Sequence, residues 1–276
     1  MKAIITAGGK GTRLYPISRS YPKELIPFCG IPVIEHSINI LRDNGIKDII
    51  VLAGVKKGAL QDYLGNGSIF GVNISYVIQE DPKGLGHAVQ VLEPYVDDED
   101  FVLVLGDNIY LGDVNIQQMV RNHVQCKALS TIFIEHSQEP EKFGVVKFED
   151  VNNECKKITA LYEKPRDEKT KNEFKINYGW YTIAGIYIFN RDIFNFLRNT
   201  PKGFGNEIQL TDAIKLSLKD DRDIFGYIFN GRRIDVGTWD YLVEEKRFYN
   251  NLSDNDLRDI ILNRNTMMNK INGYKT

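Results

Sequence analysis

The segment that decides the predicted fold is Ala3-Ile4-Ile5-Thr6-Ala7-Gly8-Gly9-Lys10-Gly11-Thr12-Arg13. It begins with a short β-branched apolar run, which is typical of a strand buried on both faces. The glycines that follow, Gly8, Gly9 and Gly11, let backbone N–H groups approach phosphate oxygens closely, and Arg13 adds donors suited to phosphate. We therefore interpret this loop as a phosphate-binding loop, with a tight strand-to-helix turn as the alternative.

Two familiar phosphate-binding motifs do not fit the loop. It lacks the Gly-Lys-Ser/Thr ending of a Walker A sequence. Leu14 stands where a dinucleotide-binding fingerprint requires its third glycine or alanine, and no clear ribose-binding acid follows. These differences disfavour a nicotinamide-dependent oxidoreductase.

Strand and helix patterns alternate along the first half of the chain, and the second half is less regular. The predicted strands are 3–6, 49–52, 74–78, 101–105, 144–148, 158–163, 182–189 and 224–229. The predicted helices are one that ends at Asn44-Gly45 and those at 57–64, 86–95, 116–124, 191–198, 207–219 and 238–250. This pattern predicts an α/β fold with a mostly parallel, doubly wound (Rossmann-like) mixed sheet and helices on both faces, whose second half extends the first sheet.

The composition of the 276 residues, 42% hydrophobic and 26% charged, is that of ordinary globular proteins. A formal net charge of -2 provides no broad positive field, so neither nucleic acid nor a membrane is an expected partner. The three cysteines, Cys29, Cys126 and Cys155, form no Cys-x-x-Cys pair, which argues against structural zinc and disulfides. We expect a cytoplasmic protein with a small-molecule partner.

Three charged residues beyond the loop are candidates for a site. Lys23 lies between two prolines that stiffen its backbone, and it is a possible phosphate counter-charge, although a solvated surface lysine is the alternative. Asp107 follows the predicted strand 101–105, and ligands of open α/β sheets bind at such carboxyl ends. Asp235 also follows an apolar stretch. Because one or two carboxylates plus substrate phosphates hold Mg²⁺, both aspartates are candidate magnesium ligands, with an Asx-turn or helix cap as the alternative.

Six short motifs occur in the order seen in sugar-phosphate nucleotidylyltransferases. They are Ala-Gly-Gly-Lys-Gly-Thr-Arg from residue 7, Pro-Lys-Glu-Leu-Ile-Pro from 22, Gly-Asp-Asn-Ile-Tyr from 106, Phe-Gly-Val-Val from 143, Glu-Lys-Pro from 163 and Asp-Val-Gly-Thr from 235. The chain resembles this family from residue 1 to about 250, with glucose-1-phosphate thymidylyltransferases and UDP-glucose pyrophosphorylases as the nearest branches. The resemblance implies the nucleotide-diphospho-sugar transferase type of fold. It implies one domain over residues 1–250, with a nucleotide-binding half (about 1–125) and a sugar-binding half (about 126–250), and then a helical extension and tail over 251–276.

The resemblance also implies roles for individual residues. Those that match nucleotide-binding positions are Gly8, Gly9, Gly11, Thr12, Arg13, Lys23 and Asp107, together with Gln79 and Gly84, which match positions that read a pyrimidine base. Those that match the sugar-phosphate pocket are Asn108, Gly144, Glu163, Lys164 and Ile183. Asp107 and Asp235 match the magnesium aspartates, and Arg13, Lys23 and Lys164 supply the remaining catalytic charge, with Lys164 facing the attacking phosphate.

The implied reaction is an in-line attack by a sugar-phosphate oxygen on the α-phosphorus of a nucleoside triphosphate, assisted by Mg²⁺, with pyrophosphate leaving. Glucose 1-phosphate is the expected sugar. The motifs conflict on the nucleotide. The segments at 106–110 and 235–238 look like the branch that uses dTTP, which we slightly prefer, whereas Glu24, Gly86-His87 and 207–212 look like the branch that uses UTP. The resemblance implies a homo-oligomer. A non-catalytic sugar-nucleotide-binding protein is the alternative from another class, disfavoured because both aspartates and all three cations are present.

Overall fold

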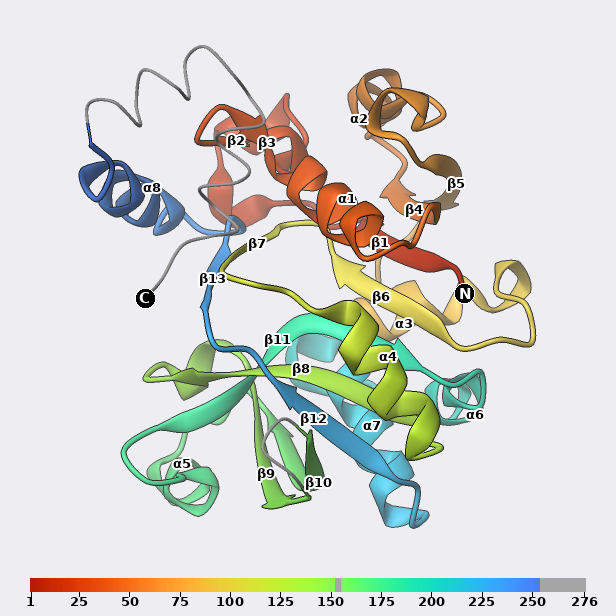
Figure 1. Ribbon diagram of the computed structural model, residues 1–276, viewed down its shortest axis with the longest axis vertical. Helices are drawn as coiled ribbons and strands as arrows, with labels where there is room; N and C mark the ends of the chain where they lie inside the picture. Colours follow the sequence, from red (N-terminus) through yellow and green to blue (C-terminus); the bar gives the residue numbers. More distant parts are fainter. Residues whose placement is uncertain (152–154, 254–276) are drawn as a thin grey trace.

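One mixed sheet runs through the part of the chain that the computed structural model describes, residues 1–151 and 155–253. The sheet is formed by β1 (Ala3–Ala7), β4 (Asp48–Gly54), β5 (Asn73–Gln79), β6 (Phe101–Leu105), β8 (Ser130–Ser137), β9 (Gly144–Asp150), β10 (Cys155–Glu163), β11 (Trp180–Phe189) and β12 (Ile224–Ile228). These nine strands lie in the order β5-β4-β1-β6-β11-β8-β12-β10-β9 (Figure 1). The first four, β5-β4-β1-β6, pair in parallel, as their continuous apolar runs predict.

The second half of the sheet differs from the prediction of a mostly parallel arrangement. β11 pairs antiparallel with both β6 and β8, and β10 pairs antiparallel with both β12 and β9. β9 also pairs with β11, so the five strands β11-β8-β12-β10-β9 close into a barrel-like unit. The short connection between Asp150 and Cys155 requires antiparallel pairing, because a parallel pair needs a crossover of about a dozen residues or more. The predictions of a mixed α/β sheet and of a second half that extends the first are confirmed.

Helices cover both faces of the sheet, because successive side chains of its strands point in opposite directions. On one face lie α1 (Val33–Asp43), α2 (Gly58–Leu64) and α4 (Ile116–Gln125), and on the other lie α3 (Leu85–Gln90), α6 (Ile193–Arg198) and α7 (Leu210–Lys219). Within β1, Ile5 packs in the cluster that contains Ile34 of α1, while Ile4 packs in the opposite cluster with Val89 of α3. Strand β1 is therefore buried from both sides.

The remaining elements lie beside the sheet. They are α5 (Glu168–Phe174), α8 (Tyr241–Asn250) and the paired short strands β2 (Pro27–Phe28) with β3 (Ile31–Pro32) and β7 (Asn108–Leu111) with β13 (Arg232–Asp235). The predicted helix 86–95 is shorter than expected, since α3 ends at Gln90 and a separate 3₁₀ turn covers Glu93–Tyr95. The predicted extension and tail lie outside the described residues from position 254 onward. In the described residues we find no helix with the length and apolar character needed to cross a bilayer.

Candidate functional site

The glycine-rich loop after β1 borders a first cavity of about 400 Å³, whose lining includes Gly8, Gly9, Lys23 and Gln79. The loop approaches these side chains closely. A Cβ at Gly8 would lie 2.6 Å from Gln79 Oε1, and one at Gly9 would lie 3.3 Å from Lys23 Cε. Gly11 has a φ of 65°, which favours glycine, and its carbonyl accepts a 2.6 Å hydrogen bond from the Ser18 hydroxyl. Glycine is therefore required here for close packing around the cavity.

Gln79 ends β5 with its side chain fixed by a histidine. Its Nε2 donates to His87 Nδ1 over 2.9 Å, so His87, to which the sequence assigned no role, orients this amide. Burial is the main reason that the pKa of His87 is lowered, which keeps Nδ1 free to accept. Gly84, by contrast, has a packing function: its φ is 104°, and a Cβ there would lie 2.6 Å from the Ile208 carbonyl oxygen.

Lys23 and Asp107 form an ion pair that joins this first cavity to a second one. Lys23 Nζ donates to Asp107 Oδ2, and the two side chains are only 11% and 20% exposed. Burial alone would lower the pKa of Lys23, but the Asp107 and Glu24 carboxylates outweigh it and raise this pKa. Burial alone would raise the pKa of Asp107, but the Lys23 ammonium outweighs it and lowers that pKa. Both groups are therefore charged.

The structure brings the two candidate magnesium aspartates together. The Val236 N–H donates to the Asp107 carbonyl over 2.9 Å, and Asp235 lies opposite Asn108 in the ladder of β7 and β13. Arg13 Nη2 lies 3.8 Å from Asp235 Oδ2. No cluster of three or more His, Cys, Asp or Glu side chains suited to a metal occurs in the described residues. Two neighbouring carboxylates fit Mg²⁺, which takes its other ligands from water and substrate phosphates.

The second cavity, of about 270 Å³, is lined by the five residues predicted for the sugar phosphate together with Arg13, Asp107 and Asp235. Glu163 accepts a 2.6 Å hydrogen bond from the Thr211 hydroxyl and lies 3.1 Å from Lys164 Nζ. A Cβ at Gly144 would lie 2.8 Å from Ile183 Cδ1. The Glu163-Lys164 pair is thus part of a cavity wall, which argues against an exposed charged turn.

The predicted residues consequently divide between two adjoining cavities. The first is lined by Gly8, Gly9, Lys23 and Gln79, and the second by Arg13, Asp107, Asn108, Gly144, Glu163, Lys164, Ile183 and Asp235. Gly11, Thr12 and Gly84 line neither cavity. Three further lining residues were not predicted from the sequence: Lys57 in the first cavity, and Thr211 and Arg233 in the second. The sequence could have indicated Arg233, because it precedes Asp235 by two positions in a strand and therefore lies on the same face as Asp235.

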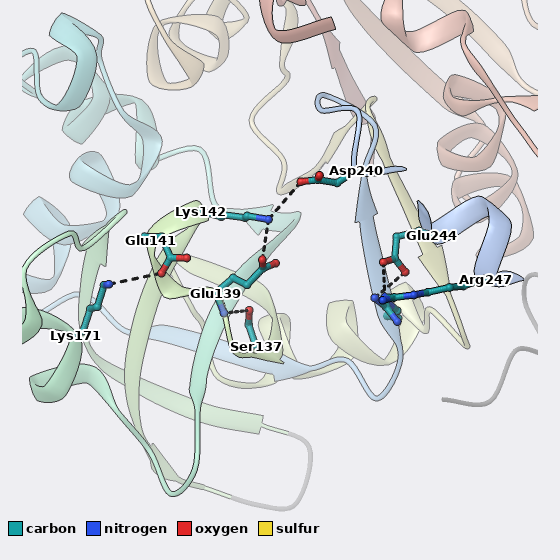
Figure 2. Close-up of polar contacts among 9 residues, drawn as sticks. Ser137, Glu139, Glu141, Lys142, Lys171, Asp240, Glu244 and Arg247 are labelled. Carbon is teal, nitrogen blue, oxygen red and sulfur yellow. Dashed lines mark hydrogen bonds and ion pairs between the residues drawn. The ribbon is translucent and has the colours of Figure 1, made fainter. Parts of the chain in front are cut away.

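A third cavity, of about 960 Å³, adjoins the second and shares Lys142 and Arg233 with it. Figure 2 shows Lys142 between two carboxylates, with Nζ 2.7 Å from Glu139 Oε1 and 3.4 Å from Asp240 Oδ2. These contacts tie the turn before β9 to the residue that precedes α8. Glu244 of α8 binds Arg232 of β13 over 2.6 Å. The ladder that carries Asp235 is therefore fixed to the neighbouring helix.

Comparison with known proteins identifies the family of the chain. Residues 2–251 match the family model described as Nucleotidyl transferase. The chain is 33% identical over 252 residues to the glucose-1-phosphate thymidylyltransferase of Neisseria meningitidis, covering 90% of this chain and 82% of the relative. It is 31% identical over 259 residues to UTP–glucose-1-phosphate uridylyltransferase 1 of Staphylococcus saprophyticus, covering 86% and 88%. A solved UDP-glucose pyrophosphorylase complexed with UDP-glucose is similar, with a TM-score of 0.79 and 29% identity over 90% of this chain and 97% of that chain.

Proposed function

Because the chain belongs to the nucleotidyl transferase family, a sugar-1-phosphate nucleotidyltransferase family, we propose that it joins glucose 1-phosphate to a pyrimidine nucleoside triphosphate and releases pyrophosphate. The observation that carries the proposal is the meeting of two cavities at one ion pair. Lys23 lines the first cavity, Asp107 lines the second, and the two side chains contact each other. Two anionic substrates bound in these cavities would meet at this point.

The first cavity is the proposed nucleotide site. Gly8 and Gly9 allow the triphosphate to approach the backbone, and Lys23 supplies a counter-charge. We assign the fixed amide of Gln79, on the wall of this cavity, to reading the pyrimidine base. Gly11, Thr12 and Gly84 act by shaping the loop and the start of α3, since none of them lines the cavity.

The second cavity is the proposed site for glucose 1-phosphate. Glu163 accepts from Thr211 and retains acceptor capacity for a sugar hydroxyl. Lys164, on the same wall, neutralises the sugar's phosphate and orients its attacking oxygen. The wall also contains Asn108, Gly144 and Ile183. Because Gly144 has no side chain, Ile183 packs against its backbone and space remains in the cavity for the sugar ring.

Asp107 and Asp235 would hold Mg²⁺, which is typical of this family and supplies positive charge to phosphate oxygens when bound. The cations of the chain change partners as substrates enter. Lys23 leaves Asp107 and Arg13 leaves Asp235, and each then binds a phosphate oxygen. Positioning and charge neutralisation of this kind dominate catalysis of such transfers, so no covalent nucleophile is required.

We favour dTTP as the nucleotide because of the segments at 106–110 and 235–238, and we keep UTP as the second candidate because relatives of nearly equal identity carry either name. A cytoplasmic homo-oligomer and the division into nucleotide-binding and sugar-binding halves belong to the same proposal. A non-catalytic sugar-nucleotide-binding protein is the competing function. The presence of all the charged residues that turnover would need speaks against it.

A pyrophosphate-release assay tests the proposal. The protein is given dTTP, UTP, CTP, ATP or GTP with the 1-phosphates of glucose, mannose, galactose and an amino sugar. We expect the highest kcat/KM with glucose 1-phosphate and dTTP or UTP. A purine nucleotide preferred by tenfold, or about 1.4 kcal/mol, would contradict the base assignment, and a better sugar would replace glucose.

The two aspartates provide the matching variants. Asp107→Asn and Asp235→Asn should each lose most of the turnover and keep the circular-dichroism spectrum of the wild type, because each removes charge from the site and leaves the apolar core unchanged. Asp113→Asn, an exposed aspartate soon after β7, is the control and should retain activity. Near-normal Mg²⁺-dependent activity in either site variant would remove that aspartate from the metal site.

A further inference from the structure

The ladder formed by β7 and β13 has two unlike faces. Ile109 and Ile234 point into an apolar cluster with Phe248 of α8. The alternate positions put Asn108, Tyr110, Arg233 and Asp235 on the opposite face, with Asp235 opposite Asn108 and Arg233 opposite Tyr110. Arg233 and Asp235 are therefore neighbours on one face, separated along the strand by about 7 Å.

Arg233 is held in a single orientation by its surroundings. Its side chain is only 4% exposed, and its Nε donates to Glu135 Oε1 over 2.8 Å. Its backbone N–H donates to Glu135 Oε2 over 3.2 Å, so one carboxylate fixes both ends of the residue. The Phe143 ring covers a face of the guanidinium, with its centroid 3.7 Å from Cζ. The remaining hydrogen-bonding directions lie in the guanidinium plane.

Within the described residues, one nitrogen of this guanidinium is buried without a partner. Arg233 Nη2 is buried and has no hydrogen-bond partner among the described residues. An arginine stays protonated, and a buried charged donor without an acceptor is costly. Arg233 also lines the second and third cavities. The unsatisfied nitrogen thus belongs to a residue in the wall of the proposed sugar site.

We propose that Arg233 donates a hydrogen bond from Nη2 to a hydroxyl oxygen of the sugar, and so determines which sugar 1-phosphate is accepted. This inference rests on the proposed function. Asp235 marks the phosphate end of the ladder face, and Arg233 lies one side-chain spacing further along it, where the sugar ring extends from its phosphate. Glu135 already neutralises the guanidinium, so the site offers a directed donor suited to a neutral hydroxyl.

The test measures kcat/KM for the preferred nucleotide with glucose 1-phosphate and with its 2-, 3-, 4- and 6-deoxy analogues. The variant is Arg233→Lys, which keeps a positive charge beside Glu135 and loses the planar fork of donors. A double variant, Glu135→Gln with Arg233→Met, removes the donor without leaving a buried carboxylate. The control is Arg232→Met, which removes the neighbouring arginine on the other face, the one bound to Glu244.

We expect both Arg233 variants to lose about 10- to 100-fold in kcat/KM with glucose 1-phosphate, the range for a lost hydrogen bond to a charged group. The KM for the nucleotide should change less than twofold. With one of the deoxy analogues, the wild type should have a kcat/KM as low as that of the variants with glucose 1-phosphate. The variants should have the same kcat/KM for that analogue as for glucose 1-phosphate, because the hydrogen bond is already absent. The Arg232→Met control should show the wild-type pattern of analogue preferences.

Equal losses of the variants on glucose 1-phosphate and on every deoxy analogue would overturn the inference, since a purely structural ion pair does not distinguish hydroxyl groups. Unchanged kinetics, or a loss confined to the nucleotide KM, would overturn it as well. In either case the activity of the wild type would leave the proposed function intact. A wild type that turns over no sugar 1-phosphate would overturn the proposed function and this inference with it.

Discussion

Replacing Lys23 by methionine should strengthen divalent-metal binding to the nucleotide-free protein. In the free protein the Lys23 ammonium occupies Asp107, one of the two carboxylates that the proposal assigns to magnesium. A metal ion that binds first must displace it. Methionine keeps much of the length of the side chain and removes the charge, so Asp107 becomes available.

The magnitude follows from the burial of the pair. With side chains 11% and 20% exposed, an effective dielectric constant of about 20 is appropriate, and two unit charges about 4 Å apart then attract by about 4 kcal/mol. The cost of desolvating both charges offsets much of this attraction. We take about 1–2 kcal/mol as the net competition, which corresponds to metal binding about 5- to 30-fold tighter in Lys23→Met.

When the nucleotide is present, Lys23→Met should weaken metal binding instead of strengthening it. Lys23 then neutralises the phosphates, so its loss weakens binding of the nucleotide and of the metal that accompanies it. Electron paramagnetic resonance titration of Mn²⁺, a probe for Mg²⁺, measures both affinities, without nucleotide and with a non-reacting triphosphate analogue. Lys169→Met, an exposed lysine of α5 outside both cavities, is the control and should change neither metal affinity.

Metal affinity of Lys23→Met equal to or weaker than that of the wild type without nucleotide would refute the competition. A gain in affinity that persists with the nucleotide bound would refute the exchange of partners, because Lys23 would then have no function toward phosphate.

Two further predictions concern groups around the first cavity. Burial, followed by the Lys83 charge, lowers the pKa of His87 below its ordinary value of 6.5, so the nucleotide KM should rise several-fold as the pH falls through that lowered pKa and His87 can no longer accept from Gln79. Steady-state kinetics between about pH 5 and 7 measure this, and an unchanged KM would contradict it. Lys57→Met should lower the free energy of unfolding by about 3–5 kcal/mol in urea denaturation, because it leaves Glu24, which is 1% exposed, without its ion-pair partner. Adding Glu24→Leu should recover most of this loss, and a double variant as unstable as the single one would contradict the reasoning.

The parallel half of the sheet could be predicted from sequence because its signal is local. Ile4 and Ile5 are both apolar, although they point to opposite faces, and the structure buries them in two different clusters. A continuous apolar run therefore indicates a strand covered on both sides. The loop after it was recognisable for the same reason, since strand, glycines and arginine are contiguous.

In the closed half of the sheet, strands close to β9, β10, β11 and β12 were predicted, but β8 and the mostly antiparallel pairing were not. Strand β8 was missed because several of its residues are polar, including Thr131 and Glu135, yet both are buried. Thr131 hydrogen-bonds His123, and Glu135 binds Arg233, which lies far away in the sequence. From sequence alone, a polar residue is assigned to the surface unless its hydrogen-bond or ion-pair partner is known. The same limit explains why Arg233 was absent from the predicted site although Asp235 was included.

The charges of the two cavities indicate how such a site selects its ligands. Each ion pair around them joins a cation to a carboxylate: Lys23 to Asp107, Arg13 to Asp235, Lys164 to Glu163, Lys57 to Glu24 and Arg233 to Glu135. Under the proposed function, a polyanion that enters alone takes Lys23 and Arg13 and leaves two carboxylates without partners beside its own negative charge. A polyanion that arrives with a divalent cation leaves neither aspartate without a partner, because the cation takes the two carboxylates that Lys23 and Arg13 release. The exchange of partners therefore favours a metal–nucleotide complex over the free nucleotide, which the chain's small net charge alone would not do.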